Sequence, residues 1–220
     1  RRFAAEGTAE VLLTGSTGFI GRHLLRRLLD DGLRVRTLVR RTPETALFND
    51  PRVETFLGNL GNPDDVDRAM RGVRRVYHAA GMVAGHAEDF QCANCEGTRN
   101  LIESCLRHGV EKLVYLSSSA VLHAAAAGNG RPIAEDWPYE PYPERRGLYT
   151  QTKLQAEHMV LDAVRDRGLR AVLLRPGEVL GPDKVFLSGA VGRDVAGRVL
   201  VLGNGRSVIP VIWMADLLDA

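Results

Sequence analysis

The chain has 220 residues, of which 45% are hydrophobic and 25% are charged, a composition that is ordinary for a folded globular protein. Its formal net charge of +2 is too small to favour a nucleic acid or an anionic membrane surface as a partner. No apolar run reaches the roughly 18 residues that a membrane-spanning helix needs, so no membrane span is expected.

The N-terminus and the cysteine content both favour a cytoplasmic protein. Residues 1–6 show no hydrophobic core of a secretion signal, and they lack an initiator methionine, which suggests a processed or trimmed chain. The three cysteines, Cys92, Cys95 and Cys105, cannot all pair, as expected in a reducing compartment. Cys92 and Cys95 form a C-x-x-C, but no second pair follows at zinc spacing, so we expect cysteines that line the core and no metal site.

Strand and helix patterns alternate along the chain. The predicted strands are Val11–Thr14, Val35–Val39, Val53–Leu57, Arg75–His78, Leu113–Ser117 and Ala171–Arg175. The predicted helices are Gly21–Leu29, Pro63–Met70, Asn94–Arg107 and Leu148–Val164. This alternation predicts an α/β fold with right-handed crossovers, a doubly wound parallel sheet and helices on both faces.

The first strand runs directly into three glycines, Gly15, Gly18 and Gly21, with the spacing G-x-x-G-x-x-G. Gly15 permits a tight turn, Gly18 lets the backbone approach a pyrophosphate, and Gly21 lets the next helix pack closely on the sheet. The helix N-terminus would then face the phosphates of a dinucleotide. Glycines that serve packing alone are the alternative. The expected contacts are Gly15, Ser16, Thr17, Gly18, Phe19 and Ile20.

The end of the second strand bears on the choice of cofactor. A carboxylate there would accept hydrogen bonds from the ribose of NAD, whereas an arginine would pair with the 2′-phosphate of NADP. Directly after the second strand this chain has Arg40 and Arg41, and the first carboxylate that follows them is Glu44. NADP is therefore favoured, with NAD as the alternative if the arginines form only a solvated basic strand end.

Tyr149 and Lys153 lie four residues apart and share one face of the predicted helix that holds them. A phenol of ordinary pKa near 10 is a poor proton shuttle at neutral pH unless a nearby cation favours its anion. Lysine is rare here, since Lys112, Lys153 and Lys184 are the only three among 29 basic residues. The strand upstream ends in three serines, 117–119, and strand carboxyl ends are where ligands bind in open α/β sheets.

The glycine motif, the serine-ending strand and the Y-x-x-x-K pair together resemble the extended short-chain dehydrogenase/reductase family. The resemblance continues through 76–81, 94–98, 174–176 and 181–182, in family order and at family spacing. It implies a Rossmann-type fold over 1–220, with about 177–220 starting a small substrate-binding part. Ile209–Leu217 resembles the segment just before the family's C-terminal helices, so the chain is expected to stop within that part.

The resemblance also implies roles for individual residues. Tyr149 would be the general acid or base, and Lys153 would hold the nicotinamide ribose. Ser118 would hydrogen-bond the substrate oxygen, with Ser119 as the alternative. Ser117 would be the last residue of the strand. Asn59 stands where the family commonly has an aspartate contacting adenine. The further cofactor contacts implied are Asn59, Leu60, Ala79, Ala80, Gly81, Asn94, Tyr149, Lys153 and Pro176.

The neighbours of these residues in the sequence exclude or disfavour some reactions of the family. Ser119 and Ala120 follow Ser118 where sugar-nucleotide 4,6-dehydratases carry an acidic pair, and 175–178 lacks the amide typical of sugar-nucleotide epimerases. Leu-Arg-Pro at 174–176 is closer to the 3β-hydroxysteroid dehydrogenase and dihydroflavonol reductase branches. The resemblance therefore implies an NADP-dependent oxidoreductase that interconverts a hydroxyl and a ketone on a hydrophobic or steroid-like small molecule.

Other functions stay open at this point. One alternative is a nucleotide-sugar epimerase with tightly bound NAD, and a second is a non-catalytic dinucleotide-binding sensor, although sensors typically lose the tyrosine or the lysine. A homodimer is also left open. The long irregular stretch 124–146 precedes Tyr149 and is either a flap over the substrate or a mobile surface excursion.

Overall fold

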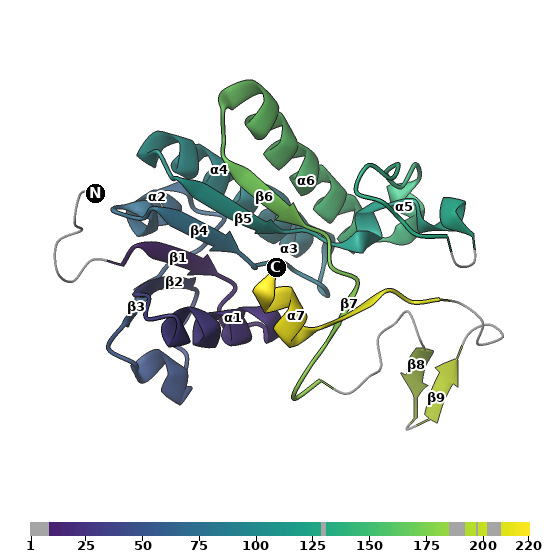
Figure 1. The fold of residues 1–220 in the computed structure, drawn as a ribbon, viewed down its shortest axis with the longest axis horizontal. Helices are drawn as coiled ribbons and strands as arrows, with labels where there is room; N and C mark the ends of the chain where they lie inside the picture. The colour runs from purple at the N-terminus through teal and green to yellow at the C-terminus, as the bar shows by residue number, and fades with distance from the viewer. Residues whose placement is uncertain (1–8, 129–130, 185–191, 197, 202–207) are drawn as a thin grey trace. The chain divides into compact units, whose positions relative to one another are not determined.

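The computed structural model describes residues 9–128, 131–184, 192–196, 198–201 and 208–220 (Figure 1). The expectation about a secretion signal at residues 1–6 lies outside them. The chain divides into two compact units, and the described parts of Arg1–Ser117 and Tyr142–Leu174 form the first. The described parts of Ser118–Pro141 and Arg175–Ala220 form the second. Among the described helices, none combines the length and the apolar character needed to cross a membrane.

The first unit is built on a sheet of six parallel strands in the order β3-β2-β1-β4-β5-β6. The strands are β1 (Val11–Thr14), β2 (Val35–Val39), β3 (Val53–Leu57), β4 (Arg75–His78), β5 (Lys112–Leu116) and β6 (Ala171–Leu174). The strand order reverses between β1 and β4, which is the Rossmann arrangement, so the predicted fold class is confirmed. The first four strands have the predicted bounds, whereas β5 begins and ends one residue earlier and β6 ends one residue earlier.

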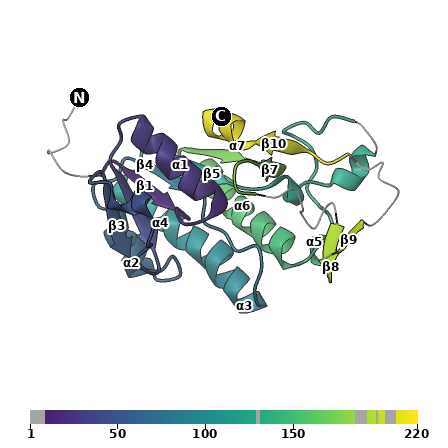
Figure 2. The same cartoon turned by 90° about the horizontal axis from the view of Figure 1, so that it is seen from below.

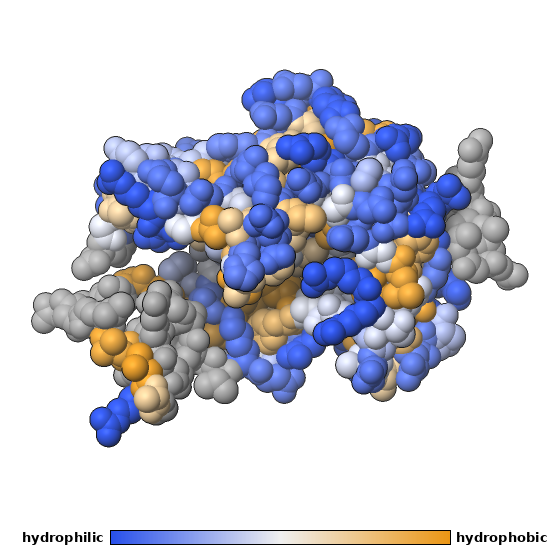
Figure 3. Space-filling model, turned by 180° about the vertical axis from the view of Figure 1, so that it is seen from behind, coloured by the Kyte–Doolittle hydropathy of each residue, from blue (hydrophilic) through white to orange (hydrophobic). Residues whose placement is uncertain are grey.

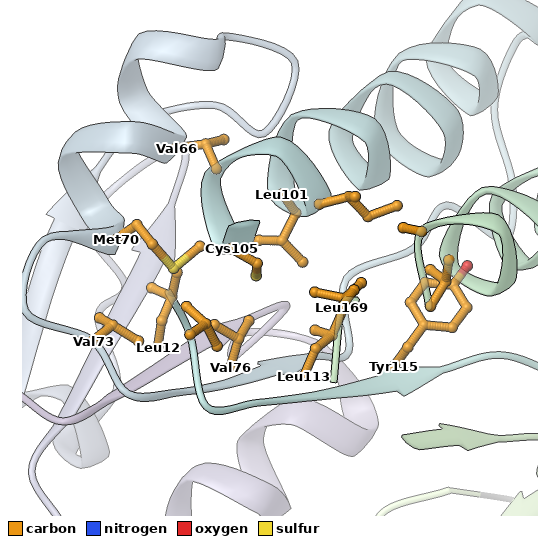
Figure 4. Packing of buried hydrophobic residues seen from close by; sticks show 14 of the residues in the cluster. Leu12, Val66, Met70, Val73, Val76, Leu101, Cys105, Leu113, Tyr115 and Leu169 are labelled. Carbon is orange, nitrogen blue, oxygen red and sulfur yellow. The ribbon is translucent and has the colours of Figure 1, made fainter. Parts of the chain in front are cut away.

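Helices cover both faces of this sheet (Figures 1 and 2). Helix α1 (Phe19–Asp30) packs through Leu25 and Leu28 on Val11 and Leu13 of β1. Leu12, between those two strand residues, belongs instead to the core under the opposite helix layer (Figure 4). That layer contains α2 (Pro63–Met70), α4 (Gly97–His108) and α6 (Leu148–Arg167). The alternation along β1 follows from the two-residue side-chain period of a strand.

The helix predicted to start at Asn94 begins earlier in the structure. α3 (Ala87–Phe90) leads into a π-helical segment, η2 (Gln91–Glu96), and then into α4, with helical dihedrals at Gln91 and Gly97. At the start of α3, Asp89 Oδ2 accepts a hydrogen bond from the backbone N–H of His86 at 3.1 Å. Asn94 therefore lies in the middle of a helical run, in a π segment of the kind often found at functional sites.

Helix α6, which carries the Y-x-x-x-K pair, is 20 residues long and ends three residues beyond the prediction. It follows the short helix α5 (Pro143–Arg146) and Gly147, whose φ of 94° permits the abrupt change of direction. At its other end, Gly168 takes the left-handed conformation that commonly stops a helix.

The second unit contains short elements. η3 (Ser119–Val121) and η4 (Ala124–Ala127) come first, β7 (Glu178–Leu180) pairs in parallel with β10 (Val211–Trp213), and α7 (Met214–Asp219) follows. β8 (Gly192–Val195) and β9 (Arg198–Val201) form an antiparallel hairpin. Hydrophobic side chains are visible on this hairpin in the space-filling view (Figure 3). Within the stretch 124–146, Tyr139 forms an isolated antiparallel bridge with Leu122, which precedes the stretch.

Candidate active site

The predicted residues of the first unit follow the carboxyl ends of neighbouring strands. Gly15 follows β1, Arg40 follows β2, Asn59 follows β3 by two residues, and Ala79 follows β4. Because all six strands run in parallel, these ends share one edge of the sheet. This edge is where ligands bind in open α/β folds, at the point where strand order reverses.

The glycine turn is held against the chain that leaves β4. Gly15 has a φ of 75°, and a Cβ atom on it would lie 2.5 Å from the backbone nitrogen of Ala80. A Cβ atom on Gly21 would run into the carbonyl of Gly15, so the missing side chain at Gly21 lets α1 pack closely on the turn that leaves β1. The backbone nitrogen of Gly18 closes the turn on Gly15 O at 2.9 Å.

The start of α1 presents backbone donors without a local acceptor side chain. Its N-cap is Gly18, which makes no side-chain cap, and the first turn contains no acidic residue. Ser16 is fully buried, and its hydroxyl has no hydrogen-bond partner among the described residues. A buried orphan hydroxyl beside an uncapped helix N-terminus and a close backbone turn fits the diphosphate of a dinucleotide.

The residues predicted to contact the rest of the cofactor differ in their surroundings. Arg40 and Arg41 are exposed, Ala79 and Ala80 are half-buried, and Gly81 is exposed. Thr17 and Gly18 are exposed, whereas Phe19 and Ile20 are half-buried in the first turn of α1. These side chains and backbones line the sheet edge, and their contacts with a cofactor stay predictions.

Asn59 makes hydrogen bonds within its own loop. Its side-chain oxygen accepts from Gly61 N at 3.1 Å, and its backbone nitrogen donates to Asp65 Oδ2 at 2.9 Å. The next carbonyl, Leu60 O, accepts from Asn100 Nδ2 at 2.8 Å. One lone pair of the Asn59 amide oxygen is thus used locally, and the second is what an adenine amino group would contact.

Tyr149 and Lys153 lie one turn apart on α6, as predicted. Tyr149 is half-buried, whereas Lys153 is only 4% exposed. The Lys153 nitrogen donates to Leu116 O at 2.6 Å and to the Tyr115 hydroxyl at 3.2 Å, so it reaches the carboxyl end of β5. Burial lowers the pKa of Lys153 to about 8, while the charge of Glu157 opposes this shift.

Glu157 lies one turn beyond Lys153 on the same helix face and is completely buried. Its carboxylate accepts a hydrogen bond from the hydroxyl of Ser117. Ser117 lies just past the end of β5, but its backbone nitrogen still donates to Leu174 O of β6 at 2.7 Å. Ser117 therefore continues the pairing with β6, and its hydroxyl is used within the fold.

Asn94 joins three elements. Its amide oxygen accepts from Met82 N at 2.7 Å, and its amide nitrogen donates to Thr152 Oγ1 at 2.9 Å and to Met82 O at 3.3 Å. The side chain is 2% exposed. Both amide protons are thus used within the protein, tying η2 to α6 and to the chain after β4, and a direct cofactor contact by Asn94 stays a prediction.

The predicted serine belongs to the second unit. Ser118 is half-buried, and its hydroxyl accepts from Ala120 N at 3.2 Å at the start of η3. Ser119 donates its backbone nitrogen to Pro176 O at 2.9 Å, so the predicted Pro176 lies beside the serine turn. The Ser118 hydroxyl keeps its own proton for donation, which is what a substrate oxygen would need.

Arg175, next to Pro176, holds the segment before α5. Its guanidinium donates to Glu135 O at 2.7 Å and to the Tyr139 hydroxyl at 2.8 Å, and it lies over the Tyr139 ring. Trp137 Nε1 donates to His123 O at 3.0 Å in the same segment. These contacts tie residues 135–139 to Arg175 and His123, while a flap function stays a prediction.

Several buried polar residues around Lys153 were missed by the sequence analysis. They are Thr14, His78, Thr98, Tyr115 and Glu157. A tyrosine or histidine inside an apolar strand was an available signal, because a buried polar group needs a partner. Within the residues that the structure describes, no three histidine, cysteine, aspartate or glutamate side chains cluster as metal ligands.

The model of the NAD dependent epimerase/dehydratase family matches residues 11–220. The chain is 34% identical over 203 residues to sterol demethylase protein B of Methylococcus capsulatus, covering 90% of the chain and 59% of that protein. It is 31% identical to the decarboxylating sterol-4-alpha-carboxylate 3-dehydrogenase of Mus musculus, covering 92% of the chain and 55% of that protein.

Among solved structures, the fold is similar to UDP-glucose 4-epimerase of Thermus thermophilus in complex with NAD. The TM-score is 0.74 at 27% identity, covering 95% of the chain and 72% of that structure. The chain thus spans between half and two thirds of the two curated relatives.

Proposed function

Because the chain belongs to the NAD-dependent epimerase/dehydratase family, we propose that it is an NADP-dependent oxidoreductase acting on a hydrophobic, steroid-like small molecule. The reaction interconverts a hydroxyl and a ketone. The observation that carries the proposal is the burial of Lys153 at the carboxyl end of β5, one helical turn after Tyr149.

The free thiols of the three cysteines support a cytoplasmic location.

The sheet edge supports dinucleotide binding. The uncapped start of α1, the orphan hydroxyl of Ser16 and the close turn at Gly15 suit a diphosphate. Arg40 and Arg41, exposed directly after β2, suit the 2′-phosphate that distinguishes NADP from NAD. A bound nicotinamide supplies or accepts the hydride.

The chain's own residues handle the proton. Tyr149 donates a proton to the substrate oxygen in ketone reduction and removes one in alcohol oxidation. Lys153, held on Leu116 O and the Tyr115 hydroxyl, places a positive charge that favours the tyrosine anion and binds the nicotinamide ribose. The Ser118 hydroxyl donates a hydrogen bond to the substrate oxygen, with Ser119 as the reserve.

The substrate class rests on the relatives and on the residues after the strands. The two curated relatives act on sterols by their names. Residues 175–178 lack the amide that is typical of sugar-nucleotide epimerases. Epimerisation of a nucleotide sugar with tightly bound NAD is the second candidate, favoured by the similarity to the UDP-glucose epimerase structure. A non-catalytic sensor is disfavoured because Tyr149 and Lys153 are both present.

A substrate panel tests this proposal. The protein is incubated with NADPH and either 3-ketosteroids, other hydrophobic ketones or UDP-sugars, and the characteristic near-ultraviolet absorbance of NADPH is followed. We expect consumption with hydrophobic ketones, its loss in Tyr149→Phe, and neither epimerised product nor thermal stabilisation with UDP-sugars. Epimerisation of a UDP-sugar without net NADPH consumption would replace this function with the second candidate.

A further inference from the structure

A row of buried polar side chains runs from α6 across two strands to β1. Lys153 Nζ lies 3.2 Å from the Tyr115 hydroxyl, and Thr98 is among the groups that act on the pKa of that hydroxyl. Thr98 Oγ1 lies 3.2 Å from His78 Nε2, and His78 Nδ1 lies 2.6 Å from Thr14 Oγ1. Apart from Lys153 at 4%, each is at most 1% exposed. We call these five residues the buried polar row.

The Asn94 carbonyl fixes the direction of the hydrogen bonds at Thr98 and His78. Thr98 donates its single hydroxyl proton to Asn94 O at 2.6 Å, so its oxygen accepts from His78. Burial lowers the pKa of His78 to about 3, so the ring is neutral. With its proton on Nε2, its Nδ1 accepts from the hydroxyl of Thr14. Because the Lys153 ammonium can only donate, a lone pair of the Tyr115 hydroxyl faces the lysine.

We propose that Tyr115 is a positioning residue whose hydroxyl, as a hydrogen-bond acceptor, holds the buried ammonium of Lys153 protonated and in place. Figure 4 shows the Tyr115 hydroxyl directed away from β5, toward the helix layer. The inference rests on the proposed function only for the part that Lys153 plays in the reaction.

Burial removes the charge of Lys153 from water. A buried ammonium needs acceptors, and two of its three donors are satisfied by Leu116 O and the Tyr115 hydroxyl. A hydrogen bond to the charged form raises the pKa, against the lowering effect of burial. The other titratable groups that face this pair are Tyr149 and Glu157 on α6, Cys95 on η2 and His78 on β4.

The substitution Tyr115→Phe isolates the hydroxyl from the ring. Lys153 Nζ lies 4.6 Å from the centre of the Tyr115 ring, and phenylalanine keeps that face and its packing. Only the acceptor is removed. Tyr77→Phe on the neighbouring strand is the matched control, because Tyr77 packs in the core on the α1 side of the sheet.

The test reads the titration of Lys153 directly. With three lysines in the chain, 13Cε-lysine labelling gives three NMR signals, and the exposed Lys112 and Lys184 serve as internal references. We expect Tyr115→Phe to lower the pKa of Lys153 by about one unit, a tenfold change in its protonation equilibrium. Tyr77→Phe should leave it unchanged, and the alkaline limb of the kcat/KM profile should move with the Lys153 titration.

An unchanged Lys153 titration in folded Tyr115→Phe would overturn the proposal. If that variant does not fold, Tyr115→Met replaces it, because methionine adapts to irregular core space and lacks the hydroxyl. It should also lower the Lys153 pKa, and a wild-type value would overturn the proposal. A shift in the Lys153 signal without turnover of any ketone would leave this inference standing and remove the proposed function. Turnover of a ketone without a change in the Lys153 pKa would leave the proposed function standing and overturn this inference.

Discussion

The ammonium nitrogen of Lys153 lies 3.2 Å from the hydroxyl oxygen of Tyr115, although the two residues are 38 positions apart in the chain. This contact, with the bond to Leu116 O, ties the candidate catalytic helix α6 to the carboxyl end of β5. It also places a cation at a buried site, where its effect on neighbouring groups is screened less than in water. The behaviour of this cation underlies the first two predictions.

Tyr149→Phe is expected to reduce kcat by about a hundredfold or more, which is typical for lost acid–base catalysis. Affinity for the cofactor should change little, because the aromatic ring itself is retained. Steady-state kinetics and calorimetric titration with the cofactor measure the two effects. Unaltered turnover would remove Tyr149 from the reaction.

Replacing Lys153 by methionine should change how stability depends on pH. The folded pKa of about 8 lies below the ordinary lysine value of 10.5, so between these values the unfolded chain binds more protons. The wild type should therefore gain free energy of unfolding relative to Lys153→Met as the pH rises through this window, by on the order of 3 kcal/mol. Urea titrations of both proteins across this range give the difference, and other titrating groups cancel. A pH-independent difference would contradict the lowered pKa.

Arg40→Ala should weaken NADPH binding and leave NADH binding nearly unchanged. One charge-assisted hydrogen bond is worth roughly 1.5–3 kcal/mol, so the loss should be about ten- to a hundredfold. Arg34→Ala is the control, because Arg34 is exposed just before the opposite end of β2. Calorimetry with both cofactors at two salt concentrations measures this. Equal losses for NADPH and NADH, or a wild-type preference for NADH, would show that Arg40 makes no contact with the phosphate.

Alanine substitutions at Gly15 and Gly32 distinguish the cost of a left-handed backbone from the cost of steric overlap. Gly15 and Gly32 have similar φ values, 75° and 79°, but a Cβ atom has no neighbour within 4 Å at Gly32 and meets Ala80 N at 2.5 Å at Gly15. Gly32→Ala should cost about 1–2 kcal/mol from the left-handed backbone alone. Gly15→Ala should cost clearly more and also weaken cofactor binding. Thermal unfolding compares the two, and equal destabilisation would argue against the close packing of the turn.

Local sequence patterns were enough to predict the framework. The bounds of β1 to β4 and the start of α6 follow from hydrophobic periodicity and from glycine, both of which act over a few residues. The glycine spacing located the turn after β1, and the four-residue spacing of Tyr149 and Lys153 put them on one face of α6. The helical run through Asn94 was misjudged, because its start at Ala87 is supported by Asp89 and its middle is a π segment that no simple period reveals.

The surroundings of the candidate catalytic lysine were decided by tertiary structure alone. Tyr115, Thr98, His78 and Thr14 come from three strands and one helix, and each looks by itself like an ordinary residue of a buried element. The direction in which the Thr98 hydroxyl donates depends on the Asn94 carbonyl, which the π segment places within reach of Thr98. The sequence by itself determined the bounds of β1 to β4 and the spacing of Tyr149 and Lys153, because hydrophobic periodicity and residue spacing are local properties. Only the folded sheet determined which buried polar residues share a hydrogen bond, because that depends on strand order and register between residues 20 to 64 positions apart.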